Sequence, residues 1–147
     1  MIPENDIIFT TSQTQETGNI APLLYEIKHG LQLLLDCGDE TVIDLRRLPL
    51  NPEEEQKLET FLGTGEVKAN VSALGDTTII ESRYSGVWVE THYNEESDIM
   101  GKYIRVALFP PILQAQPEDM ASSLKRLTDD LKVIKNTDQP IQWSELK

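Results

Sequence analysis

Apolar residues recur along this chain with two different periods. Between residues 19 and 37 they recur every three or four positions, which predicts a helix with one apolar stripe. Gly38 follows the stripe and predicts a left-handed C-cap, and Gly30 inside it predicts close packing of a neighbouring element. The same period over residues 117–135 predicts a second long helix, whose stripe runs from Met120 to Ile134.

A shorter helix is predicted between these two. Asn51 is a good N-cap, Pro52 suits the first helical position, and three glutamates complement the helix dipole. Leu58, Phe61 and Leu62 are expected to form its apolar face, and Gly63 ends it.

Period-two alternation dominates between residues 65 and 109. It predicts four strands, at about 66–74, 77–84, 87–93 and 100–109, in addition to a strand at 41–46. The connections within the group of four are short, which favours an antiparallel meander. The predicted fold class is therefore α+β, a mostly antiparallel sheet with helices packed on one face.

The chain reads as one domain. No linker interrupts residues 19–135, which we expect to form a single α+β domain. Residues 1–18 are mostly polar and are interpreted as a flexible N-terminal arm, and residues 136–147 as a C-terminal tail.

Charge narrows the classes of partner. The chain has 147 residues and a formal net charge of −12. A strongly acidic protein is a poor match for nucleic acid or for an anionic membrane surface, so a basic partner is the better expectation. No apolar run approaches the ~20 residues that span a bilayer, and the first residues do not resemble a secretory signal. These features favour a cytoplasmic protein without membrane insertion.

A search for reactive chemistry finds little. Cys37 is the one cysteine, so the chain alone forms no disulfide and no thiolate metal cluster. His92 and Glu90 share a strand face and could begin a metal site or an acid–base pair, although a polar cross-strand pair is the favoured interpretation. We expect no catalytic residues, no metal and no cofactor.

Two groups of side chains suggest recognition rather than catalysis. Trp88 follows the Ser85–Gly86 turn, where it is either a core tryptophan or part of a binding surface. Asp44 and Arg46 are expected on one face of the strand at 41–46, either as a local ion pair or as a charged binding surface.

Several of these segments carry a family resemblance. They are Ile43-Asp44-Leu45-Arg46, Leu48-Pro49-Leu50, Leu62-Gly63-Thr64-Gly65-Glu66-Val67 and Tyr84-Ser85-Gly86-Val87-Trp88. In this order and spacing the chain resembles the C-terminal conserved region of the HupH/HyaF-type hydrogenase expression proteins, over about residues 22–113. Family members are longer, and this chain looks like a single copy of the conserved region.

The resemblance implies an accessory role rather than an enzyme. Such proteins are regarded as maturation factors or chaperones of nickel–iron hydrogenase that act on the iron–sulfur small subunit, or its precursor, before assembly and export. Other hydrogenase accessory proteins are further expected partners. The residues we expect at the partner-binding surface are Asp44, Arg46, Gly63, Gly65, Glu66, Gly86, Val87 and Trp88.

Two alternatives remain open. The chain could be a generic protein-interaction module for another client, using an exposed sheet face or edge, and such an edge could also pair two copies in a homodimer. A metal-dependent enzyme that uses His92 and Glu90 is a distant third.

Overall fold

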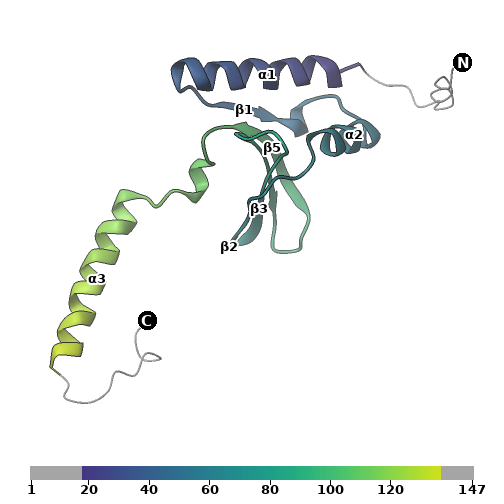
Figure 1. Ribbon diagram of the computed structural model, residues 1–147. Coiled ribbons are helices and arrows are strands. Elements are labelled where there is room, and N and C mark those ends of the chain that lie inside the picture. Colours follow the sequence, from purple (N-terminus) through teal and green to yellow (C-terminus); the bar gives the residue numbers. More distant parts are fainter. Residues whose placement is uncertain (1–17, 137–147) are drawn as a thin grey trace, which may run out of the picture. The chain divides into compact units, whose positions relative to one another are not determined.

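Five antiparallel strands form a single sheet in the described part of the chain. The structure is a computed structural model that describes residues 18–136 (Figure 1). The strand order is β1-β5-β4-β3-β2, so β2 to β5 form the predicted meander and β1 adds to its far edge. The strands are β1 (Thr41–Asp44), β2 (Lys68–Ala73), β3 (Gly75–Glu81), β4 (Val87–Tyr93) and β5 (Ile99–Val106).

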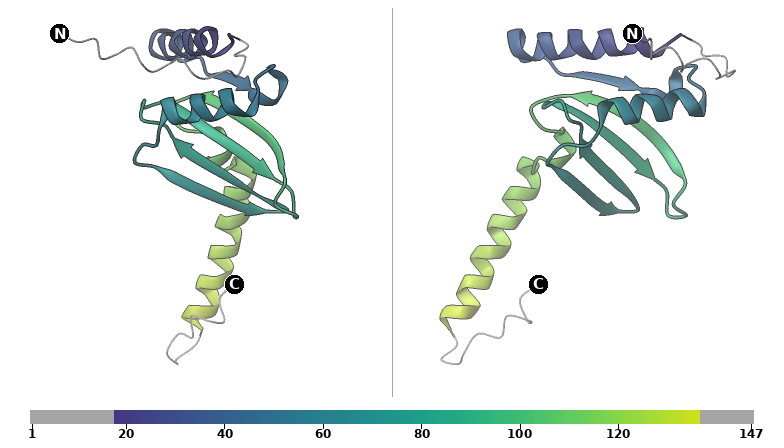
Figure 2. Two further views of the ribbon diagram at one scale, coloured as in Figure 1. Left: turned by 90° about the vertical axis from the view of Figure 1, so that its right-hand side faces the viewer. Right: turned by 45° about the vertical axis from the view of Figure 1, so that its right-hand side comes forward.

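Two helices cover one face of this sheet (Figure 2). They are α1 (Ile20–Cys37) and α2 (Pro52–Leu62). The core joins Leu23 and Ile27 of α1 and Leu58 and Leu62 of α2 to strand residues that share one face, among them Ile104. The predicted α+β class, with an antiparallel sheet and helices on one face, is confirmed for these elements.

Local signals in the sequence place both helices correctly. Gly38 has φ of 76° and caps α1 as predicted. Asn51 and Glu54 form a reciprocal capping box at the start of α2, in which the Asn51 Oδ1 accepts a 2.8 Å bond from the Glu54 N–H. A Cβ at Gly30 would lie 3.0 Å from the Thr41 Oγ1, so the glycine does permit the expected close packing of α1 on β1.

The first strand is shorter than predicted. It ends at Asp44, and residues Leu45–Arg47 form a 3-10 turn, η2. The Asp44 carboxylate caps this turn by accepting a 3.0 Å bond from the Arg46 N–H. The expectation that Asp44 and Arg46 share one strand face is therefore wrong, because the capping bond bends the chain between them.

The chain divides into two compact units, one up to Pro110 and one from Pro111 onward. The second unit contains a 3-10 turn, η3 (Pro111–Leu113), and the helix α3 (Pro117–Lys135), which has the predicted bounds. The N-terminal arm and the C-terminal tail lie almost wholly outside the described residues. No helix in the described part of the chain combines the length and the apolar composition that crossing a bilayer requires.

Candidate functional site

Two of the predicted recognition segments meet in the structure. The segment after α2, residues 63–67, runs beside the end of β3 and the turn that leads into β4. The Gly65 N–H donates to the Glu81 carbonyl at 2.6 Å, and the Arg83 N–H donates to the Leu62 carbonyl at 2.8 Å. The end of α2 is thereby held against the β3–β4 turn, although 20 residues separate them in the sequence.

Glycine is required in both segments for reasons internal to the fold. A Cβ at Gly65 would lie 2.5 Å from the Ser82 carbonyl oxygen, which no real side chain tolerates. Gly86 has φ of 89°, a conformation that other residues rarely adopt. Gly63 caps α2, also with a positive φ of 64°. These glycines set the path of the backbone at the site.

Val87 and Trp88 lie inside the protein. Val87 is fully buried, and Trp88 is 5% exposed with its indole N–H donating to the Ala107 carbonyl at 3.0 Å. Burial and a satisfied indole are the properties of a core tryptophan. The Trp88 ring is therefore not part of the exposed surface.

A cluster of one cation and two aromatic rings is exposed where the end of α2 meets the β3–β4 turn. The Arg83 Cζ lies 5.3 Å from the ring centroid of Phe61 and 5.0 Å from that of Tyr84, and the two rings stack with centroids 6.0 Å apart. The Arg83 Nη2 also donates to the Tyr84 hydroxyl at 2.9 Å. We call these three residues the Arg83 cluster. All three side chains are exposed, yet their mutual contacts hold them in place.

Phe61 corrects one expectation. The sequence predicts that it shares the apolar face of its helix with Leu58 and Leu62, but those two leucines are buried while Phe61 is 44% exposed. Sequence reasoning missed all three members of the Arg83 cluster. The available signal was an Arg-Tyr pair directly before the Ser85–Gly86 turn, but nothing in the sequence connects that pair to Phe61.

Glu66 is also exposed on the segment that follows α2. Its backbone N–H donates to the Glu81 Oε1 at 3.3 Å. It is the one carboxylate among the expected site residues on this side of the molecule.

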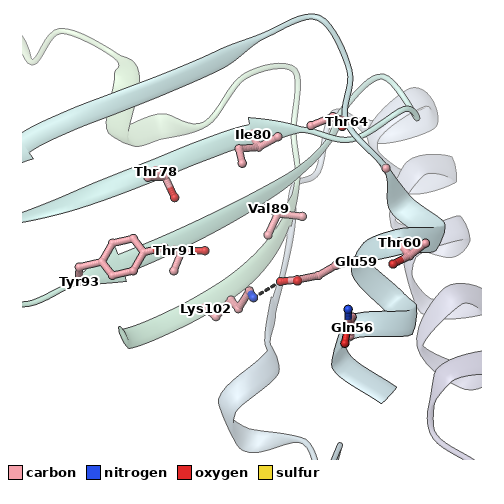
Figure 3. Close-up of a pocket in the computed structure, with 11 residues that line it drawn as sticks. Gln56, Glu59, Thr60, Thr64, Thr78, Ile80, Val89, Thr91, Tyr93 and Lys102 are labelled. Carbon is pink, nitrogen blue, oxygen red and sulfur yellow. Dashed lines mark ion pairs between the residues drawn. The ribbon is translucent and has the colours of Figure 1, made fainter. Parts of the chain in front are cut away.

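A groove of about 640 Å³ borders the site between α2 and the sheet (Figure 3). Val89 and Ile80 form its apolar floor, and threonine hydroxyls from α2, β3 and β4 line its sides. Lys102 reaches across it to form an ion pair with Glu59, and its Nζ lies 3.7 Å from the Glu55 Oε1. The groove extends to Gly63 and Thr64, so it opens directly onto the segment that carries Glu66.

Asp44 lies at the end of the edge strand β1, where it pairs with Tyr103 of β5, and Arg46 follows it in η2. The Arg46 Nη1 donates to the Ile99 carbonyl at 3.4 Å, and Ile99 pairs with Tyr93 at the end of β4. Val87 begins the same strand, six residue steps or about 20 Å away. The structure therefore does not bring Asp44 and Arg46 to the Arg83 cluster.

Glu90 and His92 form the predicted pair on the sheet face opposite α1 and α2. The His92 Nε2 lies 3.0 Å from the Glu90 Oε1, and the Thr77 Oγ1 lies 2.9 Å from the His92 Nδ1. Arg105 completes the network, with its Nε donating to the Glu90 Oε2 at 2.8 Å. The Glu90 side chain is only 3% exposed, so these bonds are what permit a buried carboxylate in this position.

This network has the features of a structural element. Both carboxylate oxygens of Glu90 already form hydrogen bonds, Oε2 with Arg105 and Oε1 with Arg105 and His92. Among the described residues, no group of three or more His, Cys, Asp or Glu side chains is arranged to hold a metal ion. The arrangement favours the polar cross-strand interpretation of Glu90 and His92 over a metal or acid–base site.

Comparison with known protein families identifies the group to which this fold belongs. The family model of the C-terminal conserved region of the HupH hydrogenase expression protein matches residues 17–134. The chain belongs to this family. The resemblance carried by the Ile43–Arg46 and Gly63–Val67 segments is thereby confirmed.

Individual HupH relatives agree with this assignment. The hydrogenase expression/formation protein HupH of Rhizobium leguminosarum bv. viciae is 28% identical over 111 residues, covering 76% of this chain and 39% of the relative. The hydrogenase expression/formation protein HoxQ of Azotobacter vinelandii is 26% identical over 113 residues, covering 76% of this chain and 40% of the relative. The chain therefore spans about two fifths of the length of these relatives.

A solved structure from the family shares the fold. The hydrogenase expression protein HupH from Thiobacillus denitrificans ATCC 25259 superposes with a TM-score of 0.77 at 33% sequence identity. The match covers 80% of this chain and 98% of that one. The names of the relatives describe hydrogenase expression or formation proteins, and they indicate no catalytic role.

Proposed function

We propose that this HupH-family chain acts as a chaperone or scaffold in the maturation of nickel–iron hydrogenase. Its client would be the iron–sulfur small subunit or the precursor of that subunit, bound before assembly and export. Membership of the hydrogenase expression family supports the maturation context. The choice of client is the step that experiments must test.

The Arg83 cluster is the observation that carries the binding part of this proposal. Arginine and tyrosine are enriched at the energetic centres of protein interfaces. Here the contacts of Arg83 with Phe61 and Tyr84 order the three side chains before a partner arrives, which lowers the entropic cost of binding. We propose that the client contacts the cluster, Glu66 and the adjoining groove, over the backbone at Gly63, Gly65 and Gly86.

From their burial we infer different roles for the other expected site residues. Val87 and Trp88 would hold the β3–β4 turn in position from inside, without touching the client. Asp44 and Arg46 would either serve a second contact beside the edge strand β1 or stabilise η2 locally.

Charge supports a basic client segment. The net charge of −12 would attract a basic segment, such as the twin-arginine signal that the family resemblance implies for an exported small subunit. Such attraction is screened by salt, so binding should weaken between low and high ionic strength.

Co-purification tests the choice of client. The tagged chain is mixed with purified small-subunit precursor and, separately, with large subunit as the control. We expect retention of the precursor only, decreasing as salt is raised from 50 to 500 mM. Equal retention of both subunits, or of neither, would contradict the proposal.

A second candidate function rests on the edge of the sheet. In the described part of the chain β2 pairs only with β3, and Lys68 is the one charged residue in the strand. Edges with few charges readily accept an extended segment of another protein. A generic interaction module would use this edge, and Val71→Pro would then abolish client binding while Arg83→Ala would not.

A further inference from the structure

The helix α3 carries an apolar stripe along most of its length. At the first four of its five positions the side chains are between 49% and 68% exposed. The stripe consists of Met120, Leu124, Leu127, Leu131 and Ile134. Contiguous exposed apolar surface on this scale marks an interaction site.

The stripe has the spacing of a coiled-coil seam. Its members alternate steps of four and three residues, which assigns Leu124 and Leu131 to heptad position a, and the other three to position d. Among the flanking e and g positions, Ala121, Ser123 and Thr128 are small, and Asp130 and Lys135 are charged. A seam this narrow suits a single partner helix better than a broad sheet surface does.

The surface of α3 contains a hollow that can accept a side chain. A hollow of about 320 Å³ lies over the first half of the stripe, and its lining includes Met120, Ser123, Leu124 and Leu127. In a parallel two-stranded coiled coil, the a-position knob of one helix fills the hole formed by residues d, g, a and d of the other. These four residues occupy those positions in that order, so the hollow matches the Leu124 side chain of a second α3.

Charge favours a second copy as the partner. The helix has four acidic and four basic residues, so α3 is neutral and the net charge of −12 resides in the rest of the chain. In a parallel pair, Asp130 at position g faces Lys135 at position e of the other helix, twice by symmetry. In an antiparallel pair, g faces g and e faces e, and no such opposite pair forms.

We propose that this protein self-associates through α3, forming a parallel two-stranded coiled coil with a second copy of the chain. The occupant of the stripe is the same stripe of the partner, with Leu124 in the hollow and Asp130 paired with Lys135 across the seam. The inference does not depend on the identity of the hydrogenase client.

Sedimentation equilibrium of the full chain between 1 and 100 µM tests the proposal. We expect a dimer with twice the mass of one chain, and a monomer at all concentrations for Leu127→Glu. Ser122→Glu introduces the same charge on the outward face of α3, and as the matched control it should leave the dimer intact. A monomeric wild type, or a dimer that survives Leu127→Glu, would overturn the proposal.

The charged pair tests the parallel register without disturbing the seam. Asp130→Lys should raise the dissociation constant at least about tenfold, and adding Lys135→Asp should restore it to within about threefold. Leu124→Cys in a Cys37→Ser background should form an interchain disulfide under mild oxidation. No effect of Asp130→Lys, together with no crosslink, would refute the parallel seam. Far-UV circular dichroism of each variant verifies that α3 stays helical.

Discussion

The buried network around Glu90 offers a quantitative test of its structural role. Replacing Arg105 by methionine keeps a long apolar side chain but removes the cation that lies 2.8 Å from the Glu90 Oε2. The side chains of Glu90 and Arg105 are 3% and 20% exposed, so water cannot take over the lost interaction. Removing one partner of a buried ion pair costs about 3–5 kcal/mol, because the other charge stays buried without compensation.

We expect Arg105→Met to lower the free energy of unfolding by about 3 kcal/mol, since His92 still contacts the Glu90 Oε1. Urea unfolding followed by far-UV circular dichroism measures this change. Adding Glu90→Gln to the variant should recover more than half of the loss, because the buried charge is then removed.

An exposed ion pair supplies the control. Lys132 lies 3.8 Å from Asp129, and their side chains are 72% and 61% exposed. Lys132→Met should change stability by less than about 0.5 kcal/mol, since exposed pairs contribute little. If Arg105→Met changed stability as little as Lys132→Met does, Glu90 would not depend on Arg105, and our account of the network as a structural element would fail.

Three further substitutions probe the fold around the site, each measured by thermal unfolding. Trp88→Ala should lower the free energy of unfolding by about 3–5 kcal/mol and leave client binding per folded molecule unchanged. Weaker binding by the folded fraction would show that the Trp88 ring contacts the client. Gly65→Ala should lower the melting temperature, because its Cβ would lie 2.5 Å from the Ser82 carbonyl oxygen, and an unchanged melting temperature would contradict that contact. Asn51→Ala should lower the free energy of unfolding by about 1 kcal/mol, because the N-cap of α2 is lost. Unchanged stability would show that the capping box is dispensable.

The sequence predicted those parts of the fold whose signals are local. Gly38 and Asn51 lie directly at the helix ends that they define, so α1 and α2 could be placed within a residue. The end of β1 was misplaced because Asp44 looks like a strand residue in a period-two pattern. Its capping bond to the Arg46 N–H depends on a backbone bend that the pattern does not encode.

The site was predicted only in part, for a related reason. Family motifs drew attention to the segments around Gly65 and Gly86, which do meet in space. The exposed Arg83 cluster was missed because Phe61 and Arg83 come together only through the packing of α2 against the β3–β4 turn. Helical periodicity places Phe61 next to Leu62 on an apolar stripe, but it does not reveal which side of the stripe the sheet leaves open.

The affinity of the chain for the hydrogenase small-subunit precursor tests the central claim most directly. Isothermal titration calorimetry would compare the wild type with the Phe61→Ala/Arg83→Ala double variant. Tyr25→Ala and Lys28→Ala serve as controls, because both residues are exposed on α1, with Tyr25 70% exposed. Our account predicts at least a tenfold weaker affinity for the double variant and wild-type affinity for both controls. Equal affinity of all four proteins, each folded, would contradict it.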